Sequence, residues 1–448
     1  MKVLIIAFWF PPSNVIGAIH VGKLARYLDR RGHDVRVVTT DIIEDRSLPL
    51  EISRERVIYT DYLESWSPFE LLVRPFRRRP AASQGNHGGA PARDGAPDKS
   101  LRRRLHRHYV GLIHIPDMRA AWVKTAIPAA RRLMESWRPD IIYASAPPYT
   151  GLIIASLLAR SFGIPWVAGL RDLWIDNPYY HEPDWRRPID AVLEWFTLRS
   201  ASRLVTVSPI WAEQLSRRHG KPAEVVYNGY AEEDFPPPPA RAEPGEVLTI
   251  RHLGSIYHGF RDPTALFAAI AMLPSGLRQT VLVEFYGEDC EVVMDAATTY
   301  GVTDAVAVRP HVPYRRALEL QMEADVLLLL QWNNRRDEGN LPAKLFEYLY
   351  ARRPILFIGY ESGIAAQLVR ERGAGLVSNS PAQIADQLRV WIMAKQQGGL
   401  ERLDASVCLG LSRDQQYEKL EQLFDEILRS ARISAIDTAA TASAHSSG

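Results

Sequence analysis

At 448 residues the chain is long enough for two domains that each bury a hydrophobic core. Hydrophobic residues make up 46% and charged residues 24%, a composition typical of soluble globular proteins that excludes a disordered or fibrous chain. The net charge of +2 is unevenly distributed: residues 71–108 contain ten Lys or Arg and two Asp, a local charge of +8, which leaves −6 for the remainder. This contrast indicates a surface that contacts an anionic partner.

The cysteine content and the N-terminus bear on the compartment. Cys290 and Cys408 are too few for a disulfide framework and lack metal-ligand spacing, which favours the reducing cytoplasm. The apolar start resembles a signal peptide, but Pro11 and Pro12 follow at once and no small-residue cleavage site appears, so a buried strand is expected there. No apolar run approaches the roughly 20 residues that span a bilayer, so an integral membrane protein is not expected.

The first half of the chain alternates between strand and helix patterns. Residues 2–10 form an apolar run typical of a buried parallel strand, 20–33 have helical spacing, and 34–40 form a second strand. The alternation resumes with helices at 117–137, 151–162 and 187–201 and strands at 140–146, 165–170 and 203–208. Residues 1–228 are therefore predicted to form a Rossmann-like domain with a parallel sheet.

A basic insert interrupts this domain at residues 71–108. Its centre, 80–98, is rich in Ala, Gly and Pro and is predicted to be disordered. The flanking arginines are Arg74, Arg77, Arg78, Arg79, Arg102, Arg103, Arg104 and Arg107. Because Leu and Phe residues accompany them, attachment to an anionic membrane surface is predicted, with a merely solvated charge run as the alternative. Nucleic acid is not expected, because Phe76 and Tyr109 are the aromatic residues near the arginines.

The second half repeats the alternation after a linker. Residues 229–246 contain four consecutive prolines and are predicted to connect two domains. Strand and helix patterns then alternate through 247–409, which predicts a second Rossmann-like domain and an α/β fold class. A helix is expected within 410–430, and the Ala, Ser and Thr-rich tail at 431–448 is expected to be disordered.

In each predicted domain, a glycine-containing loop follows the first strand. Gly17 lies in the loop 11–19, and Gly254 and Gly259 lie in the stretch "HLGSIYHGFRDP" together with His258 and Arg261. Ligands bind at the carboxyl ends of parallel strands, where helix N-termini favour phosphate. The pair of loops predicts an anion site, although an ordinary turn remains an alternative for Gly17.

Three stretches of the sequence resemble a known family. "GAIHVGKLARYLDRRGHDVRVVTT", "VVYNGYAEEDF" and "LPAKLFEYLYARRPIL" are similar to family-four retaining glycosyltransferases of the GT-B fold, especially the bacterial surface-polysaccharide branch. The resemblance implies two Rossmann-like domains that face each other across a cleft, with the C-terminal helix crossing back to the first domain. It also implies that the second domain holds a nucleotide-sugar donor and the first domain the acceptor.

The resemblance assigns roles in the donor site. Glu347 matches the second Glu of the family's paired-Glu motif and is expected to accept hydrogen bonds from ribose hydroxyls. The helix start near Leu341 is expected to face the diphosphate. The first Glu of the motif falls on Gly339, so Glu338, one residue earlier, or Lys344 is expected to take over its contacts.

Further departures concern the cationic clamp for the diphosphate. The family's Arg falls on Ser255, and Arg261 or His258 is expected to replace its Lys. In the first domain, Arg171 and Asp172 stand where many relatives carry His-Asp near the reacting sugar, although Asp172 could instead cap a turn. No metal-binding cluster is evident, and neither a metal nor another cofactor is expected.

The predicted activity is transfer of a sugar, with retention, from a nucleoside diphosphate sugar to an acceptor hydroxyl on a lipid-linked or saccharide acceptor, with UDP favoured over GDP. The catalytic candidates are Asp172, Arg171 and Arg261. The leaving phosphate could itself assist deprotonation of the acceptor, so no dedicated protein base is needed. A nucleotide-sugar epimerase of the same fold and a catalytically silent, membrane-associated nucleotide-binding scaffold remain alternatives. A location on the inner face of the cytoplasmic membrane is predicted.

Overall fold

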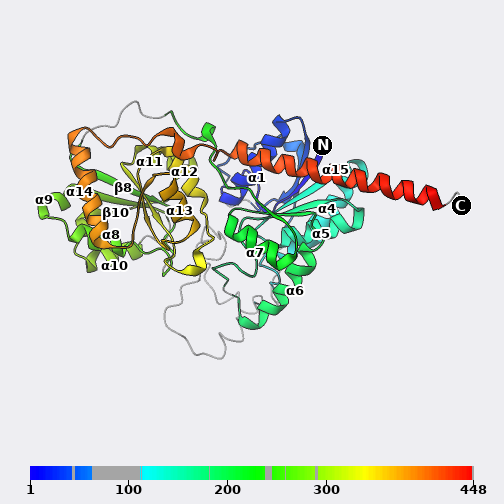
Figure 1. The fold of residues 1–448 in the computed structure, drawn as a ribbon, viewed down its shortest axis with the longest axis horizontal. Helices are drawn as coiled ribbons and strands as arrows, with labels where there is room; N and C mark the ends of the chain where they lie inside the picture. Colours follow the sequence, from blue (N-terminus) through cyan, green and yellow to red (C-terminus); the bar gives the residue numbers. More distant parts are fainter. Residues whose placement is uncertain are drawn as a thin grey trace, which may run out of the picture. The chain divides into compact units, whose positions relative to one another are not determined.

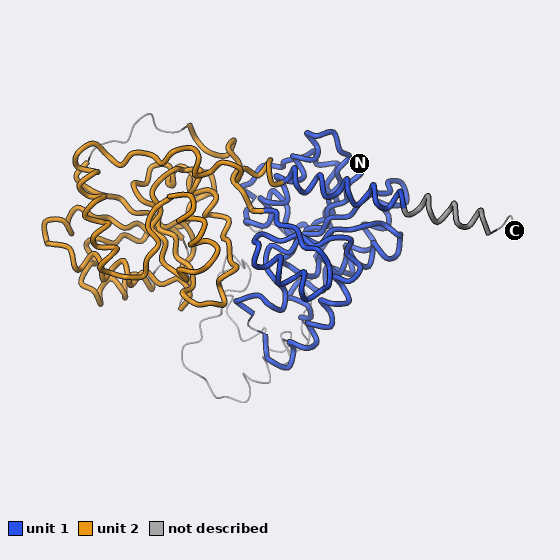
Figure 2. Tube along the Cα trace, viewed as in Figure 1, with its two compact units in different colours: residues 1–226, 417–448 blue, residues 227–416 orange. Residues whose placement is uncertain are grey.

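The computed structural model describes residues 1–42, 46–62, 111, 114–180, 182–237, 245–257, 259–287 and 291–445. The chain forms two compact units, coloured separately in Figure 2: unit 1 comprises Met1–Val226 and Tyr417–Gly448, and unit 2 comprises Tyr227–Gln416. The basic insert and His258 lie outside the described residues.

Unit 1 is built on a seven-stranded parallel sheet with the order β3-β2-β1-β4-β5-β6-β7. The central strands are buried on both faces, which explains their continuous apolar sequences. The strands are β1 (Lys2–Ile6), β2 (Asp34–Thr40), β3 (Val57–Thr60), β4 (Ile141–Ala146), β5 (Trp166–Leu170), β6 (Arg203–Thr206) and β7 (Ala223–Val225).

Helices cover both faces of this sheet (Figure 1). One face packs against α4 (Val123–Ser136), α5 (Thr150–Phe162), α6 (Arg187–Leu198) and α7 (Pro209–His219). The other packs against α1 (Ile16–Arg30) and α15 (Arg413–His445). The result is a three-layer Rossmann-like unit, as the sequence predicts.

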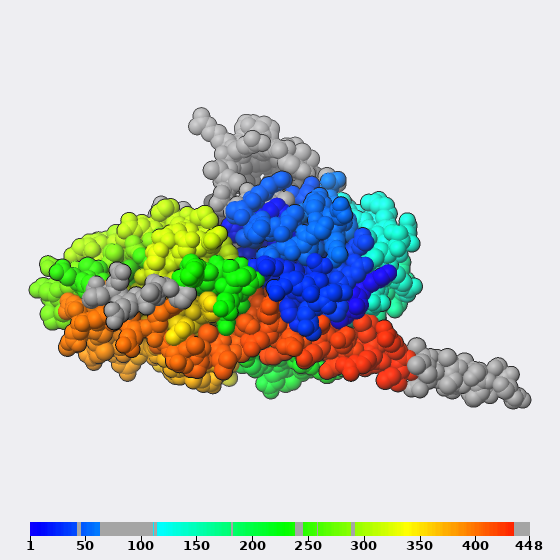
Figure 3. Space-filling view, turned by 90° about the horizontal axis from the view of Figure 1, so that it is seen from above, coloured from blue at the N-terminus to red at the C-terminus, as the bar shows by residue number. Residues whose placement is uncertain are grey.

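From Tyr417 onward, helix α15 belongs to unit 1, although the chain before it builds unit 2. Tyr417, Leu420 and Phe424 are buried against the sheet, and Figure 3 shows α15 (red) directly against the N-terminal residues (blue). The Tyr417 hydroxyl donates to the His20 carbonyl oxygen at 2.9 Å, and Tyr27 donates to Glu421 at 2.8 Å. This packing is the predicted return of the C-terminal helix, but α15 continues to His445, beyond the predicted end at residue 430 and into the stretch predicted to be disordered.

Unit 2 repeats the architecture with a six-stranded parallel sheet in the order β10-β9-β8-β11-β12-β13. The strands are β8 (Leu248–Leu253), β9 (Val281–Tyr286), β10 (Val306–Arg309), β11 (Val326–Leu330), β12 (Ile355–Ile358) and β13 (Gly375–Val377). One face is covered by α8 (Thr264–Ala271), α10 (Glu291–Thr299) and α14 (Pro381–Gln397), with the short α9 (Ser275–Arg278) beside them. The other is covered by α11 (Tyr314–Glu323), α12 (Ala343–Ala351) and α13 (Ile364–Glu371).

Several details differ from the sequence prediction. Strands β3 and β7 and helices α7 and α14 are not among the predicted elements, and α1 begins at Ile16, so Gly17 lies in its first turn rather than in a loop. The predicted linker begins inside unit 2: Tyr230 is 8% exposed and stacks on Tyr350 with the ring centres 4.4 Å apart. No helix in the described part of the chain is long and apolar enough to cross a membrane.

The burial of α15 leads to a stability prediction. Phe424 is fully buried, so Phe424→Ala leaves a cavity and is expected to lower the free energy of unfolding by about 3–5 kcal/mol. Gln422 is exposed on the same helix, and Gln422→Ala should change it by less than about 0.5 kcal/mol. Urea denaturation of both variants measures the difference, and equal effects would contradict the docking of α15.

Candidate functional site

The carboxyl ends of neighbouring strands β8 and β9 meet in unit 2 through two glycines. Gly254 follows β8 with φ +134°, and Gly287 follows β9 with φ +156°. A Cβ atom on Gly287 would lie only 2.6 Å from the Gly254 carbonyl carbon, so the two backbones touch. Both positions therefore require glycine, because a side chain at either one would collide with neighbouring atoms in a backbone conformation that other residues rarely adopt.

Two cationic side chains gather at the loop after β8. The Lys344 ammonium, from the first turn of α12, donates to the Leu253 carbonyl oxygen at 2.6 Å and occupies the space that a Cβ on Gly254 would fill. Arg261 donates from Nη1 to the Ser255 carbonyl oxygen at 2.8 Å. A glycine backbone beside a Lys and an Arg is an arrangement suited to binding an anion.

Helix α12 holds the end of β8 in place. Besides the bond from Lys344, the Tyr348 hydroxyl accepts a hydrogen bond from the Leu253 backbone N–H at 3.3 Å. Beneath the loop, His252 is fully buried, and its Nδ1 lies 2.9 Å from the Leu328 carbonyl oxygen. Burial, and secondarily the charge of Lys344, hold the pKa of His252 well below its ordinary value. The imidazole is therefore neutral, and Lys344 and Arg261 supply the positive charge at this loop.

Glu347 lies one turn after Lys344 and is 8% exposed. Its Oε1 accepts from the Tyr314 hydroxyl at 3.0 Å, and its Oε2 accepts from Gln321 Nε2 at 3.1 Å. Burial raises the pKa of Glu347, while the charge of Arg413 and these hydrogen bonds oppose the rise. Each carboxylate oxygen can accept more than one hydrogen bond, so the two internal bonds leave acceptor capacity.

The segment before α12 carries the other predicted donor residues. Glu338 is paired with Arg335 at 3.7 Å, and its backbone oxygen accepts from the Ile364 N–H at 2.8 Å. Leu341 is 2% exposed, and its carbonyl oxygen accepts from Asn228 Nδ2 at 3.5 Å. The residue that precedes α12 is Pro342, whose side chain cannot accept a hydrogen bond from the helix. The backbone N–H groups of the first turn therefore lack a side-chain cap, and such groups can bind an anion.

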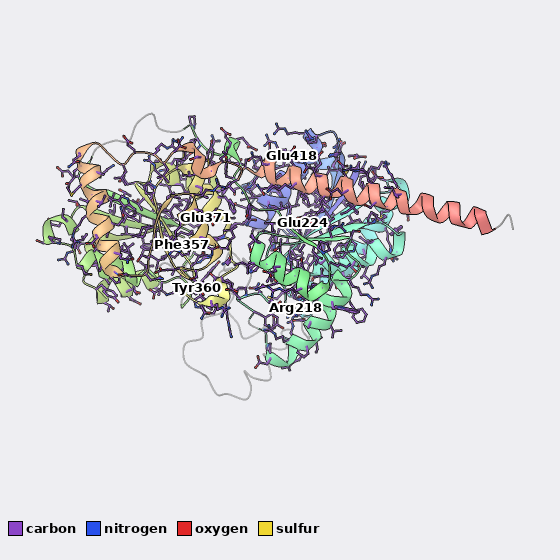
Figure 4. All side chains as sticks on the ribbon, in the orientation of Figure 1. Arg218, Glu224, Phe357, Tyr360, Glu371 and Glu418 are labelled. Atoms are coloured by element: carbon purple, nitrogen blue, oxygen red, sulfur yellow. The ribbon has the colours of Figure 1, made fainter. Side chains whose placement is uncertain are left out.

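A third glycine marks the carboxyl end of β12, where Figure 4 labels Phe357 within the strand and Tyr360 just beyond it. Gly359 has φ +159°, and a Cβ there would lie 2.9 Å from Gln331 Cβ, at the end of β11. Gly287 and Gly359 were not among the predicted site residues. Their signal in the sequence was a glycine directly after an apolar strand, in "EFYG" and "LFIG".

In unit 1, the predicted residues Gly17 and Arg171 meet at the carboxyl edge of the sheet. Arg171 follows β5 and donates from Nε to the Ser145 hydroxyl at 3.2 Å and from Nη2 to the Pro147 carbonyl oxygen at 3.4 Å. A Cβ on Gly17 would lie 2.9 Å from Arg171 Nη2, so the glycine leaves room for the guanidinium.

Burial lowers the pKa of Arg171, and the neighbouring Asp172 opposes that shift. Burial raises the pKa of Asp172, and Arg171 opposes that shift in turn. Asp172 and Arg171 are thus sequence neighbours at the edge of the sheet, and each opposes the effect of burial on the pKa of the other. Within the described part of the chain the Asp172 side chain makes no hydrogen bond to a turn, whereas Asp117 accepts from the Thr150 N–H at the start of α5 at 2.9 Å.

The structure thus groups the predicted residues into two sets. Gly254, Ser255, Arg261 and Lys344 converge on the loop after β8, with Glu347 one turn along α12. Gly17, Arg171 and Asp172 gather in unit 1. The partners of Glu347, Tyr314 and Gln321, were not predicted, because side chains of another helix carry no local sequence signal.

Comparison with known families identifies the first half of the chain. Residues 17–231 match the glycosyl transferase 4-like domain family. The matched residues make up most of unit 1. Comparison with curated protein sequences finds no match.

Solved structures extend the likeness over the whole chain. Sucrose-phosphate synthase from Thermosynechococcus elongatus is 14% identical with a TM-score of 0.61, over 96% of this chain and 100% of that one. The Anabaena protein HepE in complex with UDP is 14% identical with a TM-score of 0.57, over 96% of this chain and 100% of that one. The lipopolysaccharide outer core galactosyltransferase WaaB is 13% identical with a TM-score of 0.55, over 95% of this chain and 100% of that one. At these identities the likeness establishes the fold, which is GT-B.

The contact between the two glycine loops can be tested directly. Gly287→Ala forces a side chain into the Gly254 backbone at a strained φ and is expected to lower the free energy of unfolding by about 1–3 kcal/mol. At Gly276, on α9, a Cβ would have no atom within 4 Å, so Gly276→Ala should leave stability unchanged or raise it by up to about 1 kcal/mol. Thermal and denaturant unfolding compare the two, and a neutral Gly287→Ala would contradict the close approach.

Proposed function

We propose that the protein transfers a sugar from a UDP-sugar to an acceptor hydroxyl with retention, as a hexosyltransferase. The observation that carries this proposal is the loop after β8, where the Gly254 backbone, Lys344 and Arg261 form a cationic edge suited to a diphosphate. The structurally similar HepE is described in complex with UDP, which supports the choice of nucleotide. The match of residues 17–231 to a glycosyltransferase domain favours transfer over the epimerase and scaffold alternatives.

In the proposed donor site, the diphosphate lies against Gly254, Ser255 and the first-turn N–H groups of α12 after Leu341. The Lys344 ammonium binds a diphosphate oxygen as a compact charge, and the planar Arg261 guanidinium binds diphosphate oxygens through paired N–H groups. Glu347 accepts from the ribose hydroxyls, and its bonds with Tyr314 and Gln321 fix its orientation. Gly17, Glu338 and His258 remain predicted donor contacts.

The proposed chemistry needs stabilisation of the leaving group above all. Negative charge accumulates on the diphosphate as the bond to the anomeric carbon breaks. Arg261 and Lys344, held by carbonyl oxygens of the same loop, are oriented before the reaction and so need little reorganisation. A leaving-phosphate oxygen accepts the acceptor proton on the same face of the sugar, which gives retention.

The proposed acceptor site is the carboxyl edge of unit 1. Arg171 and Asp172 form an adjacent pair of opposite charge there, which can orient an acceptor hydroxyl or a phosphate. WaaB, one of the similar structures, is named as a lipopolysaccharide galactosyltransferase. This supports a saccharide or lipid-linked acceptor in surface-polysaccharide synthesis.

A lipid-linked acceptor fits the proposed location on the inner face of the cytoplasmic membrane. The basic segment 71–108, with its local charge of +8, would be attracted to anionic lipid at about 1 kcal/mol for each residue near the surface. This segment lies outside the described residues, and the described chain resumes at Gly111, whose carbonyl oxygen accepts from Arg186 at 3.3 Å.

Glu347→Ala is expected to weaken UDP binding, because each charge-assisted bond to the ribose contributes about 1.5–3 kcal/mol. Tyr314→Phe is the comparison variant: it removes one bond that orients Glu347 but leaves the carboxylate in place, so it should weaken UDP binding less than Glu347→Ala does. Isothermal titration calorimetry with UDP measures both affinities. If a folded Glu347→Ala variant binds UDP as tightly as the native chain, Glu347 is not a ribose contact.

Arg261→Ala is expected to lower kcat about a hundredfold or more with little loss of stability, because Arg261 stabilises charge that develops in the transition state. Arg389→Ala on α14 is the control, an Arg of the same unit with a side chain 39% exposed. Transfer of labelled sugar from UDP-sugars to a lipid extract is the assay. Native activity of Arg261→Ala would refute the role of this loop, and isomerisation or no conversion by the native chain would refute the proposed transfer.

A further inference from the structure

Helix α6 of unit 1 buries both of its carboxylates and exposes four of its apolar residues. Its two carboxylates, Asp190 and Glu194, are 1% and 2% exposed, while Ile189, Val192 and Trp195 are 42%, 56% and 46% exposed. Phe196 is likewise 46% exposed. These four apolar residues recur at three- and four-residue spacing and so form one continuous face of the helix, here called the α6 face.

The inward carboxylates have well-defined partners that account for their burial. Asp190 accepts from Arg186 Nε at 3.0 Å and from the Tyr180 hydroxyl at 2.8 Å. Glu194 accepts from the Ile175 N–H at 3.0 Å, and its other oxygen lies 2.9 Å from His219 Nε2. These bonds fix the rotation of α6, because turning the α6 face inward would break the hydrogen bonds of two buried carboxylates.

The charged groups beside the α6 face are cationic. Arg199 follows the helix on the same face, with its guanidinium 5.0 Å from the Trp195 ring centre and 4.8 Å from that of Phe196. Arg160 on α5 donates to the Phe196 carbonyl oxygen, and Leu157, one turn earlier, is 42% exposed and extends the apolar surface.

Nearby carboxylates are compensated or lie at the other end of the helix. Asp176 accepts from Arg218 Nε at 2.9 Å and lies 3.6 Å from Arg187; Arg218 is labelled on α7 in Figure 4. Glu182 forms an ion pair with Arg186 at 2.8 Å. Both Glu182 and Asp184 precede the N-terminus of α6, whereas Arg199 follows its C-terminus.

We infer that the α6 face is a membrane-docking surface that inserts Trp195 and Phe196 into the interface of a bilayer containing anionic phospholipid. Exposed clusters of large apolar side chains mark interaction sites. Trp at the headgroup level, aliphatic neighbours below it and Arg beside it are the combination that interfacial helices use. The absence of an outward carboxylate on α6 within the described chain fits an anionic rather than a cationic partner.

This inference deepens the proposed membrane attachment by naming a described surface, and it does not depend on the proposed transfer activity. Vesicle binding is measured without donor or acceptor, so the two proposals fail separately. It also differs from attachment through the basic segment, since it requires apolar insertion as well as charge.

The test is co-sedimentation of the full chain with vesicles of phosphatidylcholine, with and without phosphatidylglycerol. The double variant Trp195→Gln/Phe196→Gln is expected to reduce the partition coefficient on the anionic vesicles at least about tenfold. The matched control is Val390→Gln/Met393→Gln on α14 of unit 2, where two apolar residues are 59% and 55% exposed, and it should bind like the native chain. All four positions are exposed, so the thermal unfolding midpoints should stay close to the native value.

Three results would overturn the inference. The first is native-like vesicle binding by the Trp195 and Phe196 variant. Attachment would then occur through the basic segment, and changing the arginines of that segment to Gln would abolish it. The second is equal loss in the α14 control. The third is a native chain that forms dimers in sedimentation velocity while the variant is monomeric, which would make a second copy the occupant of the α6 face.

Discussion

Unit 1 depends on the burial of α15 against the second face of its sheet. A parallel sheet with apolar residues on both faces is stable only when both are covered, and α1 and α15 share one of them. Tyr417, Leu420 and Phe424 supply apolar contact, and Glu421 joins Tyr27 and His33 through hydrogen bonds of 2.8 and 2.7 Å. Because α15 follows unit 2 in the sequence, unit 1 has its full core only when the chain beyond unit 2 has been made.

Both units use the carboxyl edge of a parallel sheet in the same way, but with different chemistry. In unit 2, glycines after neighbouring strands bring backbones into contact, and α12 delivers Lys344, Glu347 and Tyr348 from one helix face to the end of β8 and its surroundings. In unit 1, a glycine makes room for the Arg171 guanidinium instead. The first arrangement favours an extended anion, and the second presents a paired Arg and Asp.

Helix α6 shows how burial of charge determines a surface. Asp190 and Glu194 are held inside the unit by hydrogen bonds with Arg186, Tyr180 and His219. The apolar residues on the opposite side of the helix, the α6 face, therefore point outward, whereas Leu198 at its end is buried in the core. A proposed peripheral enzyme with a lipid-linked acceptor can use such a face to hold its acceptor edge near the bilayer. The α6 face and the loop after β8 belong to different units, so the proposed attachment and the proposed donor binding can be tested by separate mutations.

The sequence by itself determined the α/β class and the two Rossmann-like units, because strand and helix periodicity are local patterns, and it pointed to Gly254 because a glycine that ends a strand is also a local pattern. It also placed Lys344 and Glu347 on one helix, since their spacing of three residues is a helical turn. Only the tertiary structure decided the extent of α15, the place of Gly17 within α1, and the Tyr314 and Gln321 partners of Glu347. The orientation of α6 belongs with these. Its pattern of apolar residues predicts one apolar face but not whether that face points inward, and the hydrogen bonds of Asp190 and Glu194 with residues outside the helix settle that question.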